Sequence, residues 1–194
     1  MTIDREPPSD GELMARVQAG AREAFALLVD RHKDVLVGYL TRLTGEVERA
    51  EDLAQEAFLR LYASARNYEE RGQLRAYLFR IATNLLRSEE RRSARWRRLR
   101  DLFAHSNGHG ETGLAPNQEK RLLSAEIGGR VGDAISELPL RYRAPLVLRE
   151  IEGLSYREIG GALGCREGTV KSRIHRGRRL LRDRLEPYWT GGRA

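Results

Sequence analysis

The chain has 194 residues, 40% of them hydrophobic, and its 35 Lys and Arg residues outnumber its 28 Asp and Glu residues, for a formal net charge of +7. This composition supports one or two folded domains and excludes a disordered protein, while the charge favours a polyanionic partner, either nucleic acid or a membrane surface. No apolar run approaches the roughly 20 residues that cross a bilayer, and the N-terminal sequence MTIDREPPSDGE lacks the features of a secretion signal, so we expect a cytoplasmic protein without membrane insertion.

The first predicted helices follow a polar N-terminus that contains a Pro-Pro pair. We expect residues 1–9 to be disordered and order to begin at Ser9 or Asp10, either of which can cap a helix. Apolar residues then recur at helical spacing until Gly45, and Gly20 predicts a break into two helices. No alternating apolar pattern typical of a strand occurs in the sequence, so the fold class we expect is all-α.

The most regular helical pattern spans residues 46–62. Its apolar residues share one narrow face, which we expect in the core: Val47, Ala50, Ala54, Ala57, Phe58 and Leu61. The opposite side presents Asp52, Glu56 and Leu59, flanked by Leu53 and Gln55. Five carboxylates and one arginine between residues 46 and 56 leave a net charge of −4 there, which repels DNA and attracts a basic protein surface. This side is either a protein-docking face or a solvated face that keeps a bundle helix soluble.

A basic helix is predicted over residues 73–95, after the loop of residues 66–72. Its inward face carries Leu74, Tyr77, Leu78, Ile81 and Leu85. The side opposite this predicted core carries residues suited to phosphate: Arg80, Thr83, Arg87 and Arg91, with Asn84 at the flank. Five further arginines follow between residues 92 and 100 around Trp96, which either stacks on a base or packs its ring onto the bundle.

The composition changes at residues 101–117, which are rich in Gly, Asn and His and contain Pro116, as is typical of a linker. We therefore expect a first domain over residues 10–98, a linker over 99–117, a second domain over 118–187 and a tail over 188–194. The patch Leu102-Phe103-Ala104 either docks somewhere or has no role. Helical spacing resumes at Leu123, stops at Pro139 and continues to Ile151.

Residues 153–185 predict a helix-turn-helix. Ser155 and Glu158 have capping-box spacing, Gly164 suits the turn, and a second helix begins near Glu167. The inward face of this second helix carries Val170, Ile174, Gly177 and Leu181, and the outward face carries Lys171, Ser172, His175, Arg176 and Arg179. Eight basic and two acidic residues between 166 and 184 leave a net charge of +6, enough for several phosphate contacts. The alternative is a solvated basic helix in an ordinary bundle.

Residue types that carry chemistry are sparse. Cys165 is the only cysteine, which rules out an internal disulfide, and its place beside the turn suits a small buried residue better than a nucleophile. The four histidines are scattered without zinc-ligand spacing: His32, His105, His109 and His175. No catalytic constellation or phosphate-binding glycine loop is readable, so we expect no enzyme activity, no metal, no cofactor and no small-molecule substrate.

Four motifs together resemble the extracytoplasmic-function (ECF) group of bacterial sigma factors, the promoter-recognition subunits of RNA polymerase. They are AEDLAQEAF at 50–58, LFRIATN at 78–84, GLSY at 153–156 and GTVKSR at 168–173. The resemblance covers nearly everything from residue 10 to residue 185, and the DLAQE helix separates this group from other helix-turn-helix regulators. It implies two small helical domains, sigma regions 2 and 4, joined by a flexible linker.

The resemblance also implies roles for individual residues in promoter recognition and melting. Core RNA polymerase would be bound by Asp52, Leu53, Gln55, Glu56 and Leu59. The promoter element near the start site would be melted, and a flipped non-template base held, by Asn67, Tyr68, Arg80, Thr83, Asn84, Arg87 and Arg91. The distant element would be read in the major groove by Thr169, Lys171, Ser172, Arg173, His175, Arg176 and Arg179. Control by an anti-sigma protein is the usual regulation in this group.

Three positions depart from the group's pattern. Many relatives have Trp at the position of Tyr77 and Asp at that of Ser88, and the position of His175 is variable. A free-standing helix-turn-helix regulator is the main alternative, with the first half as a sensing or dimerising module, although no ligand pocket or dimerisation heptad is readable. An RNA-binding or ribosome-associated protein is a further alternative, which draws on the arginine run alone.

Overall fold

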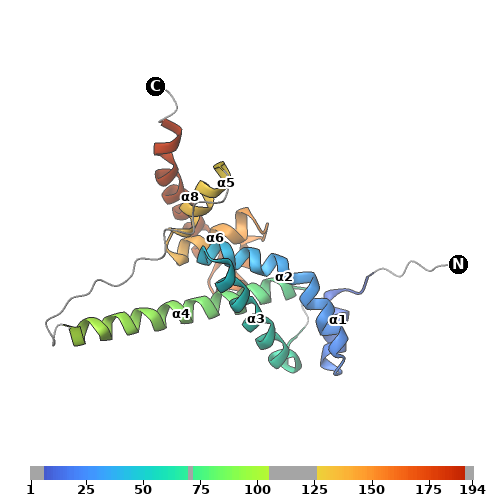
Figure 1. Ribbon diagram of the computed structural model, residues 1–194. Coiled ribbons are helices and arrows are strands. Elements are labelled where there is room, and N and C mark those ends of the chain that lie inside the picture. Colours follow the sequence, from blue (N-terminus) through green and yellow to red (C-terminus); the bar gives the residue numbers. More distant parts are fainter. Residues whose placement is uncertain (1–6, 70–71, 105–125, 191–194) are drawn as a thin grey trace.

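A computed structural model describes residues 7–69, 72–104 and 126–190 (Figure 1). Helices make up all the regular structure of these residues, which confirms the all-α prediction. In chain order they are α1 (Asp10–Gln18), α2 (Arg22–Thr44), α3 (Val47–Ser64), the short 3-10 helix η1 (Ala65–Asn67), α4 (Leu74–Ala104), α5 (Glu126–Ser136), α6 (Leu140–Glu150), α7 (Tyr156–Leu163) and α8 (Glu167–Thr190). None of these helices is both long enough and apolar enough to cross a lipid bilayer.

The first helix boundaries follow the local signals in the sequence. Ser9 caps α1 in a capping box with Glu12, whose backbone N–H donates to the Ser9 Oγ at 3.3 Å. Gly20 has a φ of 94° between α1 and α2, and Gly45 has a φ of 77° and ends α2 in the left-handed region. Both conformations are accessible to glycine without a steric cost, which is why the chain turns at these points.

Helices α1 to α4 pack around one apolar core. The predicted face of α3 is buried from Ala50 to Leu61, and Phe58 is its most exposed member at 6%. Val47, predicted on this face, is 54% exposed, so that prediction is wrong. Val47 is the first residue of α3, so the buried face of the helix begins one turn later, at Ala50.

Thr83 on α4 is buried completely, so its predicted contact with DNA is wrong. Its Oγ1 donates to the Phe79 carbonyl at 2.7 Å and therefore accepts the hydrogen bond from the Tyr39 hydroxyl, at 2.8 Å. Burial raises the pKa of Tyr39 well above its usual range, which keeps that hydroxyl protonated as the donor. Because α2 packs on α4 at this position, the buried part of α4 is wider than the inward face that the sequence predicted.

Helix α4 continues to Ala104 rather than ending near Arg95. Its C-terminal part projects away from the other helices (Figure 1). The backbone of residues 102–104 therefore forms the last turn of a helix, where the sequence predicted the start of a linker. The predictions for residues 1–6, for residues 105–125, which include most of the linker, and for residues 191–194 lie outside the described residues.

Helices α5 to α8 form a second helical group, in which α6 and α7 pack on α8. This C-terminal half contacts the N-terminal half, since α7 lies on α4 while α5 and α6 lie on α2. Buried residues of both halves belong to one continuous apolar cluster, from Leu13 in α1 to Ile174 in α8. The described helices therefore form a closed arrangement of the two halves.

The buried hydroxyl pair makes a testable prediction about stability. Replacing Thr83 by Val keeps the shape but removes the acceptor of the Tyr39 hydroxyl, so we expect the free energy of unfolding to fall by about 1–3 kcal/mol. Ser88→Ala is the matched control, because Ser88 is an exposed hydroxyl on the same helix that donates to the Asn84 carbonyl. We expect that control to stay within about 0.5 kcal/mol of the parent in urea denaturation. Equal effects of the two substitutions would contradict this account of Thr83.

Candidate nucleic-acid interface

The exposed side of α3, called here the acidic face, consists of Asp52, Leu53, Gln55, Glu56 and Leu59. Asp52, Gln55 and Leu59 are exposed, and Leu59 leaves 56% of its surface to solvent. Glu56 is half-buried and accepts a hydrogen bond from Arg60 Nε at 2.8 Å. Leu53 is half-buried against the core, so it is less available to a partner than the other four. The acidic face therefore combines negative charge with one large exposed apolar side chain.

A cavity of about 350 Å³, called here the tyrosine cavity, lies where η1 and the following loop meet α4. It brings together three residues predicted to act on the near promoter element, Asn67, Tyr68 and Arg80. Tyr77 forms another part of the wall, and its ring centroid lies 5.3 Å from that of Tyr68. Aromatic rings beside amide and guanidinium donors suit a flat polar ring such as an unpaired base.

Two side chains hold the loop of the tyrosine cavity in place. Gln18 of α1 donates from Nε2 to the carbonyls of Ala65 and Tyr68, at 3.0 and 2.9 Å. The Tyr77 hydroxyl lies 3.4 Å from Ser64 Oγ at the end of α3. These contacts of Gln18 could not be predicted from the sequence, because a polar side chain at the end of a helix can bind any loop that packs near it.

The basic stripe of α4 consists of Arg80, Asn84, Arg87 and Arg91. Arg80, Asn84 and Arg91 are exposed. Arg87 is half-buried and donates from Nη1 to the carbonyl of Leu163 at the end of α7, at 3.3 Å. The stripe is therefore partly covered by the C-terminal half in this arrangement.

The predicted helix-turn-helix is formed by α7 and α8. Ser155 and Glu158 make the capping box of α7, with the Ser155 N–H donating to Glu158 Oε2 at 2.8 Å. Hydrogen bonds from Ser155 lower the pKa of the Glu158 carboxyl, since they favour its charged form. Gly164 has a φ of 65° in the turn. A Cβ on Gly160 would lie 2.8 Å from the Cys165 carbonyl oxygen, so the close turn requires glycine there as well, which the sequence reading missed.

The inward face of α8 is buried as predicted at Val170, Ile174 and Gly177, whereas Leu181 is only half-buried. The outward residues are all exposed: Lys171, Ser172, His175, Arg176 and Arg179. Thr169 and Arg173 are half-buried at the edge of this face, and Arg173 Nη1 lies 3.7 Å from Cys165 Sγ. The five exposed residues therefore offer hydrogen-bond donors to a groove, while Thr169 and Arg173 are less accessible.

Ion pairs and hydrogen bonds join the two halves next to these surfaces. Arg75 Nη2 of α4 lies 2.7 Å from Glu152 Oε2, and the Glu152 side chain is only 7% exposed. Arg143 of α6 lies 3.8 Å from Glu90 of α4, and burial lowers the pKa of its guanidinium. Gly161 of α7 lines the tyrosine cavity. The closed arrangement thus places α7 against the surface that carries the predicted melting residues.

Within the described residues, no three His, Cys, Asp or Glu side chains lie together as metal ligands do. Cys165 is a free, half-buried thiol at the turn.

Comparisons with known proteins agree on one family for both halves. A family model for sigma-70 region 2 matches residues 28–97, and one for sigma-70 region 4 matches residues 129–181. The ECF RNA polymerase sigma factor SigE of Mycolicibacterium smegmatis is 39% identical over 183 residues, which cover 94% of this chain and 70% of that protein. The ECF RNA polymerase sigma factor SigW of Bacillus subtilis is 36% identical over 179 residues, covering 88% of this chain and 93% of that protein.

A solved structure has a similar fold. It is the sigma factor RpoE in complex with the anti-sigma factor NepR from Bartonella quintana, which superposes with a TM-score of 0.64 at 25% sequence identity. The match covers 84% of this chain and 96% of that one.

The ion pair between the halves makes a second prediction. Glu152→Arg replaces the attraction to Arg75 by a repulsion, and since each effect amounts to about 0.5–1 kcal/mol, we expect the open form to gain roughly ten-fold in population. Small-angle X-ray scattering would record this change as a larger radius of gyration. The double variant Arg75→Glu, Glu152→Arg should restore the compact form.

Glu150→Arg is the control for this experiment. Glu150 pairs with Arg178 within the C-terminal half, at 2.6 Å, so its loss should leave the halves together. An unchanged radius in Glu152→Arg, or the same increase in both variants, would contradict the role of the Arg75–Glu152 pair.

Proposed function

The chain belongs to the ECF group of RNA polymerase sigma factors and is an alternative sigma factor, and on that premise we propose how its surfaces divide the work of promoter recognition. The acidic face of α3 binds core RNA polymerase, the tyrosine cavity and basic stripe open the near promoter element, and α8 reads the distant element. The observation that carries this division is the tyrosine cavity beside the basic stripe. A free-standing helix-turn-helix regulator has no use for such a site.

Binding of core polymerase is assigned to Asp52, Gln55, Glu56 and Leu59, with Leu53 supporting them from the core side. The carboxylates steer a basic partner surface toward α3, and Leu59 supplies apolar area at the contact. The same charges disfavour DNA on this side of the molecule. The polymerase then supplies the chemistry of transcription, and we assign no catalytic residue to this chain.

Melting of the near element is assigned to the tyrosine cavity and the basic stripe. Extruding one base costs a few kcal/mol of stacking and pairing, and stacking on an aromatic ring returns about 1–3 kcal/mol. Asn67, Tyr68 and Tyr77 would hold the flipped base of the non-template strand. Arg80, Asn84, Arg87 and Arg91 would bind the strand's phosphates and offset the remaining cost. Thr83 has no part in this surface, because it is buried.

Recognition of the distant element is assigned to α8, which enters the major groove in the manner of a helix-turn-helix. Lys171, Ser172, His175, Arg176 and Arg179 present their side chains to solvent and so can reach base edges or phosphates. Thr169 and Arg173 would contact DNA only after small rotations of their side chains. Phosphate contacts supply most of the affinity and base contacts supply the specificity.

The two halves must separate before both can bind a promoter. In the closed arrangement Arg87 donates a hydrogen bond to the Leu163 carbonyl, and Gly161 lines the tyrosine cavity. We assign residues 10–98 to the domain that binds polymerase and melts DNA, residues 99–117 to the linker and residues 118–187 to the domain that reads the distant element. Since the similar Bartonella sigma factor was solved with an anti-sigma protein, we propose that an anti-sigma factor also controls this chain. The site of action is the cytoplasm, where transcription takes place.

The function is tested by adding the purified protein to core RNA polymerase with a library of promoter fragments. We expect start-site-specific transcripts that core polymerase alone does not make. Specific promoter binding in the absence of core polymerase, without binding of core, would instead establish a free-standing regulator.

The docking assignment is tested in the same assay with the variant Asp52→Lys, Glu56→Lys. Because the reversed charges repel a basic partner, we expect loss of core binding and of transcripts, with the circular dichroism spectrum unchanged. The control Glu23→Lys, Asp34→Lys changes the net charge equally at two exposed positions of α2 and should bind core normally. Normal core affinity of the first variant would refute the acidic face as the docking site.

Recognition by α8 is tested with Arg176→Ala. A good base contact contributes about 1–3 kcal/mol, so we expect affinity of the holoenzyme for the distant element to fall about ten- to hundred-fold while core affinity stays the same. Arg178→Ala is the control, because the Arg178 side chain turns to Glu150 on α6. If Arg178→Ala weakened promoter binding as much as Arg176→Ala, the assignment of the outward face would be wrong.

A further inference from the structure

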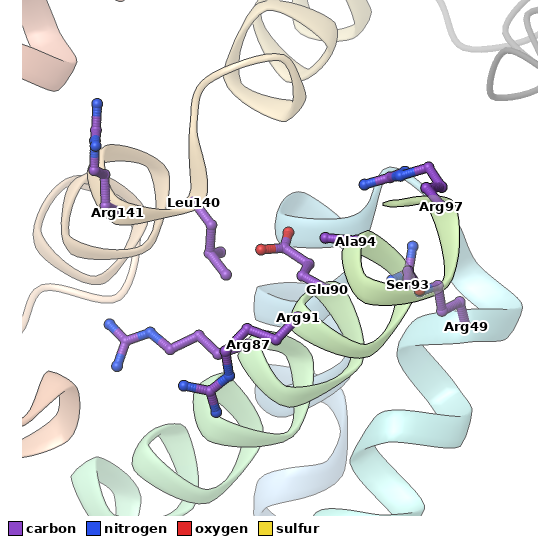
Figure 2. Close-up of a pocket in the computed structure, with 9 residues that line it drawn as sticks. All are labelled: Arg49, Arg87, Glu90, Arg91, Ser93, Ala94, Arg97, Leu140 and Arg141. Atoms are coloured by element: carbon purple, nitrogen blue, oxygen red, sulfur yellow. The ribbon is translucent and has the colours of Figure 1, made fainter. Parts of the chain in front are cut away.

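A second cavity, of about 790 Å³, opens where α3 and α4 of the N-terminal half meet α6 of the C-terminal half (Figure 2). Five arginines line it: Arg49 of α3, Arg87, Arg91 and Arg97 of α4, and Arg141 of α6. Figure 2 shows the residues of α4 on one side, and Leu140 and Arg141 of α6 on the other. We call it the arginine cavity. Arg49, Arg97 and Arg141 have no part in the surfaces assigned above.

The positive charge of this cavity is not balanced by its own walls. Glu90 is the one carboxylate that lines it, and this side chain pairs at 3.8 Å with Arg143, just outside the cavity. Arg49 is paired with Glu89 at 3.1 Å, but its Nε is buried without a hydrogen-bond partner. Among the side chains that the structure describes, Arg91, Arg97 and Arg141 have no carboxylate partner. Repulsion among these guanidinium groups favours the binding of an anion, and solvent reduces that repulsion where the side chains are exposed.

The size and lining of the arginine cavity limit which kinds of anion can bind in it. Its volume lies in the range of roughly 300–1,000 Å³ that holds small molecules, and side chains of α4 and α6 form two of its walls. The planar guanidinium group binds phosphate oxygens in bidentate fashion. A molecule with several phosphates can engage more of these guanidinium groups at once than a single phosphate can. The Arg141 guanidinium now lies over the Tyr142 ring, 4.7 Å from its centroid, on an exposed side chain that is able to turn.

We propose that the arginine cavity binds a small polyphosphate, inorganic or nucleoside-linked, which bridges α4 to α6 and holds the two halves closed. The site is a property of the chain alone and does not depend on its function in transcription. One consequence rests on the proposed function: Arg87 and Arg91 also belong to the basic stripe, so a bound polyphosphate competes with promoter DNA.

The experiment is calorimetric titration of the full chain, without polymerase, with sodium tripolyphosphate. We expect saturable binding with one site per chain. Because a charged hydrogen bond contributes about 1.5–3 kcal/mol, Arg97→Ala and Arg141→Ala should each weaken binding about ten-fold or more. Arg22→Ala is the matched control, an exposed arginine on α2 outside the cavity, and should bind as the parent does. No saturation at about 1 mM tripolyphosphate, or parental affinity in both cavity variants, would overturn the proposal.

Two further measurements test whether the ligand bridges the two halves and whether it is inorganic or linked to a nucleoside. The Glu152→Arg variant favours the open form and should bind tripolyphosphate more weakly, by up to about ten-fold, whereas unchanged affinity would overturn the bridging. Replacing tripolyphosphate by ATP or GTP tests whether a nucleoside adds affinity, and binding of either kind supports a polyphosphate site. The same preparation should also be tested for start-site-specific transcription without polyphosphate. If it transcribes but does not bind tripolyphosphate, the cavity proposal fails while the proposed function stands.

Discussion

The packing of α7 onto α4 is the contact on which most of the other surfaces depend. Helix α4 is buried against α2 and α3 on one side, and α7 covers part of the next. This contact places Gly161 at the tyrosine cavity and the Leu163 carbonyl beside Arg87, and it places Glu152 beside Arg75. One interface therefore covers part of the surface that we propose to bind the near promoter element.

The polar part of this contact is weak compared with the cores that it joins. The Arg75–Glu152 pair is partly exposed on the arginine side, where solvent reduces its contribution to about 1 kcal/mol or less. The cores of the two halves each bury many large apolar side chains, such as Leu40 and Phe79 in the first half and Leu148 and Ile159 in the second. Separation of the halves would also expose the apolar side chains that join the two cores, so a ligand or partner that binds one form shifts the balance by its difference in affinity for the two forms.

Arginines serve two opposite purposes in the same molecule. On the outward face of α8 they are spread along an exposed helix, where they are free to meet phosphates of a long polyanion. In the arginine cavity they come from both halves and line one opening, which we propose takes a small polyphosphate. The acidic face of α3 is separate from both. The net charge of +7 is therefore a sum over surfaces of opposite sign.

The sequence by itself determined the helices, their caps and turns, the helix-turn-helix and the family, because capping boxes, left-handed glycines and helical periodicity act over a few residues. It did not determine which sectors of a helix are covered, since that depends on how helices distant in sequence pack together. For this reason Thr83 was predicted to face DNA and is buried against Tyr39, and Val47 was predicted in the core and is exposed. The tyrosine cavity, the partial cover of Arg87 and the arginine cavity exist only where separate helices meet, so tertiary structure alone decided them.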